Sequence, residues 1–91
     1  MAVTPQHATL VAGDVTTLTL DRDYNRVEVL SVDGAAEVYF TVDKSTPTVG
    51  GNGCHVLPAT ICSAEVEPTT SGATVVKLIS TGTPKVSVRG L

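Results

Sequence analysis

Residues 26–42 read RVEVLSVDGAAEVYFTV, and this stretch decides the fold class. Aliphatic and polar side chains alternate in both of its halves, which is the period-two pattern of a strand with one buried face. The halves are separated by Asp33-Gly34, a dipeptide that tolerates the positive φ angles of a tight turn. The pattern predicts two neighbouring antiparallel strands, over residues 26–32 and 37–42, joined by a hairpin.

The same alternation recurs along the chain in short runs separated by Gly, Pro, Asp and Asn. These runs cover residues 8–11, 14–20, 55–57, 61–67, 74–80 and 85–89. Val and Thr recur throughout, while the chain has one Phe, two Tyr and no Trp, and branching at Cβ suits a pleated strand better than a helix. We therefore expect an all-β protein. Its fold should be a compact antiparallel β-sandwich or barrel of about eight short strands, jelly-roll or immunoglobulin-like in topology.

Length and composition predict one folded domain. A chain of 91 residues with 42% apolar and 16% charged residues is too apolar and too weakly charged to remain disordered. We expect residues 1–10 to form an N-terminal arm or an edge segment, and residues 11–91 to form a single β-sandwich domain. The first 20 residues contain no basic segment followed by a long apolar run, so the sequence predicts neither a signal peptide nor a membrane span.

Charge and motifs argue against several kinds of chemistry. The net charge is −3 and the basic residues do not cluster, so direct binding of nucleic acid is not expected. DRDYN at residues 21–25 begins like a calcium-binding EF-hand loop, but Arg26 and Val32 stand where that loop needs Gly and Glu. The glycines of residues 50–53 match neither a P-loop nor a dinucleotide-binding fingerprint. We expect no cofactor and no metal.

Four side chains are the only soft potential metal ligands: His7, Cys54, His55 and Cys62. Adjacent residues of a strand point to opposite faces, so Cys54 and His55 would neither share an ion nor form a thiolate–imidazole pair. Two cysteines are too few for a disulfide framework, so free buried thiols are expected, with a Cys54–Cys62 disulfide across a hairpin as the alternative. No serine occupies a nucleophile elbow, and the sequence predicts that the protein is not an enzyme.

Two of the expected strands carry aliphatic side chains on both faces. Leu30 and Val32 fall on the polar face of their strand. Val75 and Ile79 likewise fall on the face opposite the core face of theirs. Either these strands are buried on both sides in part of the fold, or the four side chains belong to a contact surface for another protein.

Three segments of the chain resemble those of a known family. They are RVEVLSVDGAAEVYFTVDKSTPTVGG at residues 26–51, HVLPA at residues 55–59 and SGATVVKLISTGTPKVSVRG at residues 71–90. Over residues 14–91 the chain resembles small virion proteins of tailed bacteriophages, especially phages of actinobacteria, that decorate the head or are minor structural components. Related β modules also occur in tail and fibre-associated proteins.

The resemblance implies a capsid decoration or cement protein that binds the outer surface of the major capsid protein shell and stabilises it. It implies assembly as a homotrimer, and a location on the capsid exterior of the virion after assembly in the host cytoplasm. We expect residues 2–10 to be an arm that contacts the shell or a neighbouring copy. The candidate contact residues are Val3, Pro5, Leu10, Leu30, Val32, Val75 and Ile79.

Two alternatives stand beside capsid decoration. One is a tail or head-tail structural component, because related modules occur there. The other is a carbohydrate- or host-surface-binding module, which would present exposed aromatic rings to its ligand. The chain has few aromatic rings for such a role, namely those of Tyr24, Tyr39 and Phe40.

Overall fold

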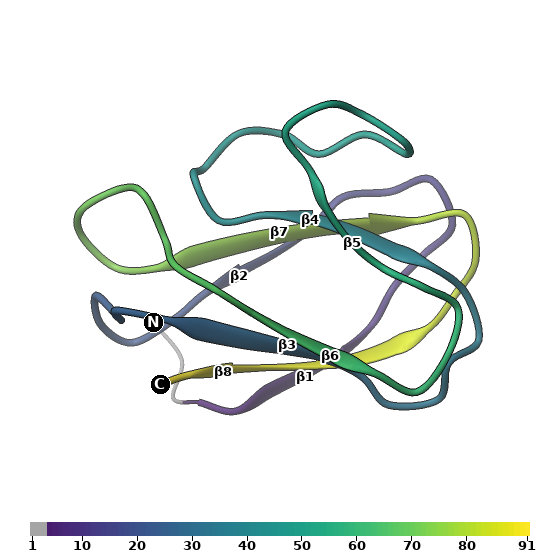
Figure 1. Ribbon diagram of the computed structural model, residues 1–91, viewed down its shortest axis with the longest axis horizontal. Helices are drawn as coiled ribbons and strands as arrows, with labels where there is room; N and C mark the ends of the chain where they lie inside the picture. Colours follow the sequence, from purple (N-terminus) through teal and green to yellow (C-terminus); the bar gives the residue numbers. More distant parts are fainter. Residues whose placement is uncertain (1–3) are drawn as a thin grey trace.

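The computed structural model describes residues 4–91, which form eight β-strands and no helix. The strands are β1 (Gln6–Thr9), β2 (Thr16–Thr19), β3 (Val27–Ser31), β4 (Val38–Thr41), β5 (His55–Leu57), β6 (Ser63–Val66), β7 (Val75–Ser80) and β8 (Lys85–Gly90). They make two four-stranded antiparallel sheets, the first in the order β1-β8-β3-β6 and the second in the order β2-β7-β4-β5. Figure 1 shows the two sheets one above the other. The predicted all-β fold is confirmed, and its two separate sheets make it a sandwich.

The chain is folded as one long hairpin that is rolled into two layers. Four antiparallel pairs run from the chain ends to the tip of this hairpin: β1 with β8, β2 with β7, β3 with β6, and β4 with β5. Successive pairs fall alternately in the first and the second sheet. This is the jelly-roll topology, so of the two predicted topologies the jelly roll is the one found. Residues 42–54 form the tip, between β4 and β5.

The predicted hairpin between β3 and β4 is wrong, because these strands lie in different sheets. Residues 32–37 instead cross from one sheet to the other. Asp33 does form a turn, but its Oδ1 accepts hydrogen bonds from the N–H groups of Ala35 (3.1 Å) and Lys85 (3.2 Å). The carboxylate therefore ties the crossing to the start of β8. Alternation showed that Val29 and Phe40 are buried, but it did not show that they face each other from opposite layers.

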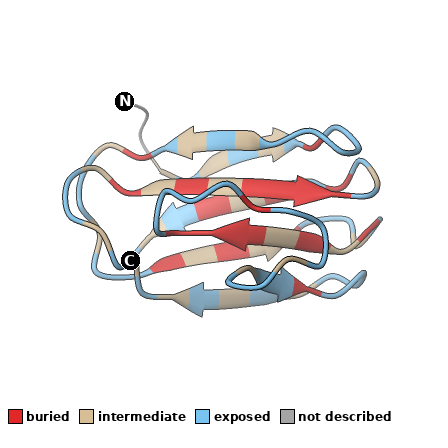
Figure 2. Ribbon diagram, turned by 90° about the horizontal axis from the view of Figure 1, so that it is seen from above, coloured by how far each residue is buried: buried red, intermediate tan, exposed pale blue. Residues whose placement is uncertain are grey.

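The core lies between the sheets and consists of aliphatic side chains around a single ring. Its fully buried members are Leu10, Leu20, Val27, Val29, Val38, Phe40, Leu57, Val76, Leu78, Val86 and Val88. Figure 2 shows how buried positions alternate with half-buried and exposed ones along the strands. Burial of this apolar surface is the main source of stability for a domain of this size.

The turn at residues 21–25 is fastened by Tyr24. Its hydroxyl donates a hydrogen bond to Asp21, and its N–H donates one to the Thr74 hydroxyl at 2.9 Å. Asp21 also forms an ion pair with Arg22, at 3.5 Å. A Cβ atom added at Gly90 would lie 2.2 Å from Cδ1 of Tyr24. The ring therefore rests directly on the backbone of β8.

Replacing Gly90 by alanine is expected to lower the free energy of unfolding by about 1–3 kcal/mol, because the added methyl group displaces the Tyr24 ring. Urea denaturation of the purified variants measures the change. In a Tyr24→Ala background the same replacement should cost much less, since the ring is gone. An equal cost in both backgrounds would show that the ring is not the cause.

Candidate protein-contact site

The outer face of the first sheet is charged at one end. Glu28 lies directly between Glu65 on β6 and Arg89 on β8 in the strand register. The Arg89 Nε atom is 2.8 Å from Oε1 of Glu28, and the Arg26 Nη1 atom is 3.4 Å from Oε2 of Glu65. These partly exposed pairs each contribute little to stability. They make this end of the face polar and solvated.

The other end of the same face is aliphatic. Leu30 lies between Ser63 and Ser87 in the register. Pairing extends by one residue beyond the bounds of β6 and of β3. The Ser31 N–H donates to the Cys62 carbonyl at 2.8 Å, and the Val32 N–H donates to the Lys85 carbonyl at 2.9 Å. We call Leu30, Val32 and Ile61 the aliphatic patch. Val32 is 45% exposed and Ile61 is 72% exposed, the largest exposed fraction of the large apolar side chains that the structure describes.

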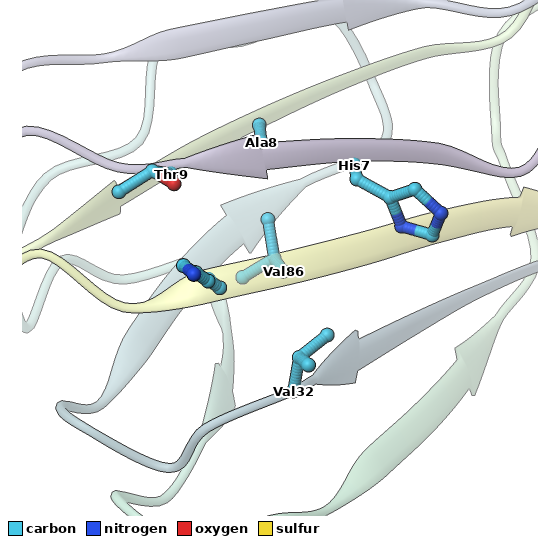
Figure 3. A pocket seen from close by; sticks show the side chains of 6 residues that line it. His7, Ala8, Thr9, Val32 and Val86 are labelled. Atoms are coloured by element: carbon cyan, nitrogen blue, oxygen red, sulfur yellow. The ribbon is translucent and has the colours of Figure 1, made fainter.

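A hollow of about 340 Å³ adjoins the aliphatic patch. Its lining residues are His7, Ala8, Thr9, Val32, Lys85 and Val86. Figure 3 shows His7 and Thr9 from β1 on one side of β8, and Val32 from the end of β3 on its other side. The walls are mostly apolar. The Lys85 side chain also lines the hollow, and its ammonium group forms no ion pair within residues 4–91. The hollow is therefore an apolar binding surface next to an unpaired positive charge.

The structure places two of the predicted contact residues in this site and adds one that the prediction missed. Leu30 is half-buried and Val32 is exposed, and both lie on the outer face as expected. The missed residue is Ile61. A signal for it was present, because alternation that points Cys62 inward points Ile61 outward.

Two predicted contact residues are corrected by the structure. Leu10 is fully buried in the core and its N–H donates to the Pro84 carbonyl at 2.9 Å. Ile79 does lie on the outer face of the second sheet, but it is only 8% exposed, opposite Tyr39. Neither side chain is available to a partner, because neighbouring elements already cover it.

The remaining predicted contact residues lie apart from the aliphatic patch. Val75 is half-buried on the second sheet and Pro5 is exposed next to β1, while Val3 lies outside the described residues. Residues 6–9 form the edge strand of the first sheet. These residues pair with β8 as part of the sandwich, whereas the sequence predicted a sandwich that begins at residue 11.

The thiols and the potential metal ligands form no reactive centre in the part of the chain that the structure describes. Cys54 and Cys62 are free, and they are half-buried rather than buried. Their Sγ atoms each lie 3.7 Å from a backbone carbonyl oxygen, that of Thr48 and that of Pro58 respectively. No group of three His, Cys, Asp or Glu side chains within residues 4–91 is arranged to hold a metal ion.

Three carboxyl groups have a lowered pKa because each accepts a hydrogen bond from a hydroxyl group. They are Asp21 with Tyr24, Glu37 with Thr81, and Asp43 with Ser45. A lowered pKa contributes stability above the ordinary carboxyl pKa, and this stability is lost as the pH falls through the lowered value. All three shifts arise from hydrogen bonds in loops and not from a coupled pair of titrating groups, so they do not mark a catalytic site.

The fold and the site together describe a jelly-roll domain with a candidate protein-contact face. Comparison of the chain with models of protein families, with curated proteins and with solved structures finds no match. No helix within residues 4–91 is long and apolar enough to cross a membrane.

Proposed function

We propose that the protein is a structural component of a tailed-bacteriophage virion, a decoration protein that binds the outside of the major capsid protein shell and stabilises it. The observation that carries the proposal is the resemblance of residues 26–51. In the structure this segment forms β3, the crossing and β4, which are inner strands of their two sheets. The segment is therefore central to the domain.

The fold supports this proposal by analogy. Double-sheet jelly rolls recur in viral capsid proteins, although they also occur in lectins and other classes of protein. For a lectin-like role, the aromatic side chains are unfavourably placed. Phe40 is fully buried in the core and Tyr24 rests on Gly90. This arrangement leaves few rings to stack on a sugar.

The distribution of exposed aliphatic side chains suits a bridging role. The first sheet presents the aliphatic patch, and the second sheet presents Val56, which is 54% exposed. A cement protein needs at least two contacts, one to the shell and one that links it to the next subunit. Many copies that each make weak contacts give a strong total effect, because the contacts act together. The rigid sandwich loses little conformational entropy when it binds.

Quantitative mass spectrometry of purified particles tests the proposal. The copy number of this chain relative to the major capsid protein is expected to be high and fixed, as for a protein that repeats over the shell. A map of the particles by electron microscopy should then show the domain on the capsid exterior. A few copies per particle would instead make it a tail or head-tail component, and particles without the chain would refute a virion role.

A further inference from the structure

The outer face of the first sheet carries a pattern that is complementary to itself. β3 runs along the middle of this face, with β6 on one side and β8 on the other. The two sides of β3 carry groups that match each other in charge and in polarity. We propose that two copies of the chain associate through this face, with a two-fold axis that runs along β3. The proposal does not depend on the virion role.

The charged end gives the first match. Glu65 and Arg89 lie at equal register on opposite sides of Glu28. A two-fold axis along β3 places β6 of one copy over β8 of the other. Glu65 of one copy then faces Arg89 of the second copy, and the contact is made twice. Opposite charges that face each other in this way fix the register of two surfaces.

Glu28 lies on the axis, so the Glu28 carboxylates of the two copies face each other. Arg89 reduces the repulsion between these two negative charges. The Arg89 Nε atom already lies 2.8 Å from Oε1 of Glu28 within one chain. The two Glu28 carboxylates are therefore each paired before the copies meet. At the next outward-facing position of β3, Leu30 of one copy faces Leu30 of the second. Beside this contact, Ser63 of each copy faces Ser87 of the other.

The aliphatic end gives the second match. Val32 bonds to Lys85 on one side, and on the other side Ser31 bonds to Cys62. Continuing this register by one residue brings Ile61 next to Val32, on the side away from Lys85. The same two-fold axis places Ile61 of one copy over Lys85 and the hollow of the second copy. Ile61 is 72% exposed, and a hollow of about 340 Å³ has room for its side chain. The stem of Lys85 adds apolar contact while its ammonium group stays in water.

The pattern favours two-fold over three-fold assembly. A two-fold contact joins the same face of both copies, so each side of β3 must match the other side. This is what Glu65 with Arg89 and Ile61 with the hollow provide. A trimer needs two different surfaces that match each other. The structure therefore points to a dimer in place of the trimer that the sequence resemblance implies.

The size of the face sets the expected affinity. Figure 1 is viewed down the shortest axis and shows the sheets one above the other, so the outer face of one sheet measures at most 30 × 19 Å, the extents of the whole domain. Such a face offers roughly 600 Å², less than the roughly 800 Å² per partner of a standard interface. We expect a weak dimer, with a dissociation constant between about 1 μM and 1 mM.

Sedimentation equilibrium of the purified chain, at concentrations up to about 1 mM, tests the proposal. The mass is expected to rise from 9.4 kDa toward twice that value. Ile61→Glu should raise the dissociation constant at least about 30-fold, because it places a charged side chain against the apolar walls of the hollow. Val49→Glu makes the same change in the tip between β4 and β5, where Val49 is 45% exposed, and should leave the dissociation constant unchanged. Thermal unfolding shows that each variant is folded.

A charge exchange provides the sharper test. Glu65→Arg and Arg89→Glu should each weaken the dimer at least about fivefold, because like charges then face each other across the axis. The double variant should recover to within about threefold of the original constant, since opposite charges face each other again. The proposal is overturned by a monomer at every concentration, by a trimeric mass, or by a dimer that Val49→Glu disrupts and Ile61→Glu does not. A double variant no tighter than the single variants would also overturn it.

Discussion

Replacing Phe40 by alanine is expected to lower the free energy of unfolding by about 3–5 kcal/mol. Phe40 is fully buried and is the only phenylalanine in the chain. Its ring centre lies 5.2 Å from that of His55. The rest of the buried core is built from Val and Leu, and none of these side chains is large enough to fill the space. Two hydrogen-bonded sheets hold the walls apart, and the cavity therefore stays open.

A loss of this size is a large part of the total stability of a small domain, which is about 5–15 kcal/mol. Urea denaturation at neutral pH measures it. Val56→Ala is the matched control, because Val56 lies on β5 next to β4 but is exposed, and it should change the free energy by no more than about 0.5 kcal/mol. If Phe40→Ala cost less than about 1.5 kcal/mol, the layers would be able to close around the missing ring.

The strands were predictable because each one is short, regular and bounded by turn residues. Residues 85–89 show this well, since Val86 and Val88 are buried while Lys85 and Arg89 are exposed. Residues 55–57 were predicted with the bounds that the structure has. Period-two alternation is a local property, and a local property can be seen in a local stretch of sequence.

The pairing of the strands was not predictable in the same way. In a jelly roll each strand pairs with one counted from the opposite end of the chain, as Gln6 does with Val88. Such pairing depends on which apolar faces meet across the whole domain. The turn signal at Asp33-Gly34 was real, but a crossing between sheets also uses a turn. Folding that waits for such distant contacts is expected to be slow for a domain of this size.

The contact site was predictable only in part. Alternation placed Val32 on the outer face, and the structure agrees. Alternation could not show that Ile79 is buried on the outer face or that Leu10 belongs to the core. The residues that bury these two side chains come from segments elsewhere in the sequence. The hollow between β1, β8 and Val32 likewise exists only once the strands are paired.

Replacing Gly34 by alanine is expected to lower the free energy of unfolding by about 3 kcal/mol or more. Gly34 has φ of 62°, a value that costs other residues about 1–2 kcal/mol. An added Cβ would also lie 2.8 Å from the Ile61 nitrogen and 2.8 Å from the Thr60 carbonyl carbon. Both are backbone atoms, so no side-chain rotation relieves the contact. The crossing and the segment before β6 must move apart.

Gly13→Ala separates the two causes of this loss. Gly13 has φ of 77° and nothing lies within 4 Å of an added Cβ. It should therefore show the conformational cost alone, about 1–2 kcal/mol by urea denaturation. The excess at Gly34 measures the contact with Thr60 and Ile61. Equal losses in the two variants would mean that the backbone before β6 yields freely.

Hydrogen exchange locates the same effect. The Ser31 N–H donates to the Cys62 carbonyl at 2.8 Å, and this bond lies next to the contact between Gly34 and Ile61. Its exchange is expected to be faster in Gly34→Ala than in Gly13→Ala, because the end of β3 loses its partner. The aliphatic patch should be disturbed along with it, since the bond between Ser31 and Cys62 joins the two segments that carry Val32 and Ile61. Unchanged protection of Ser31 would show that the patch does not depend on the glycine.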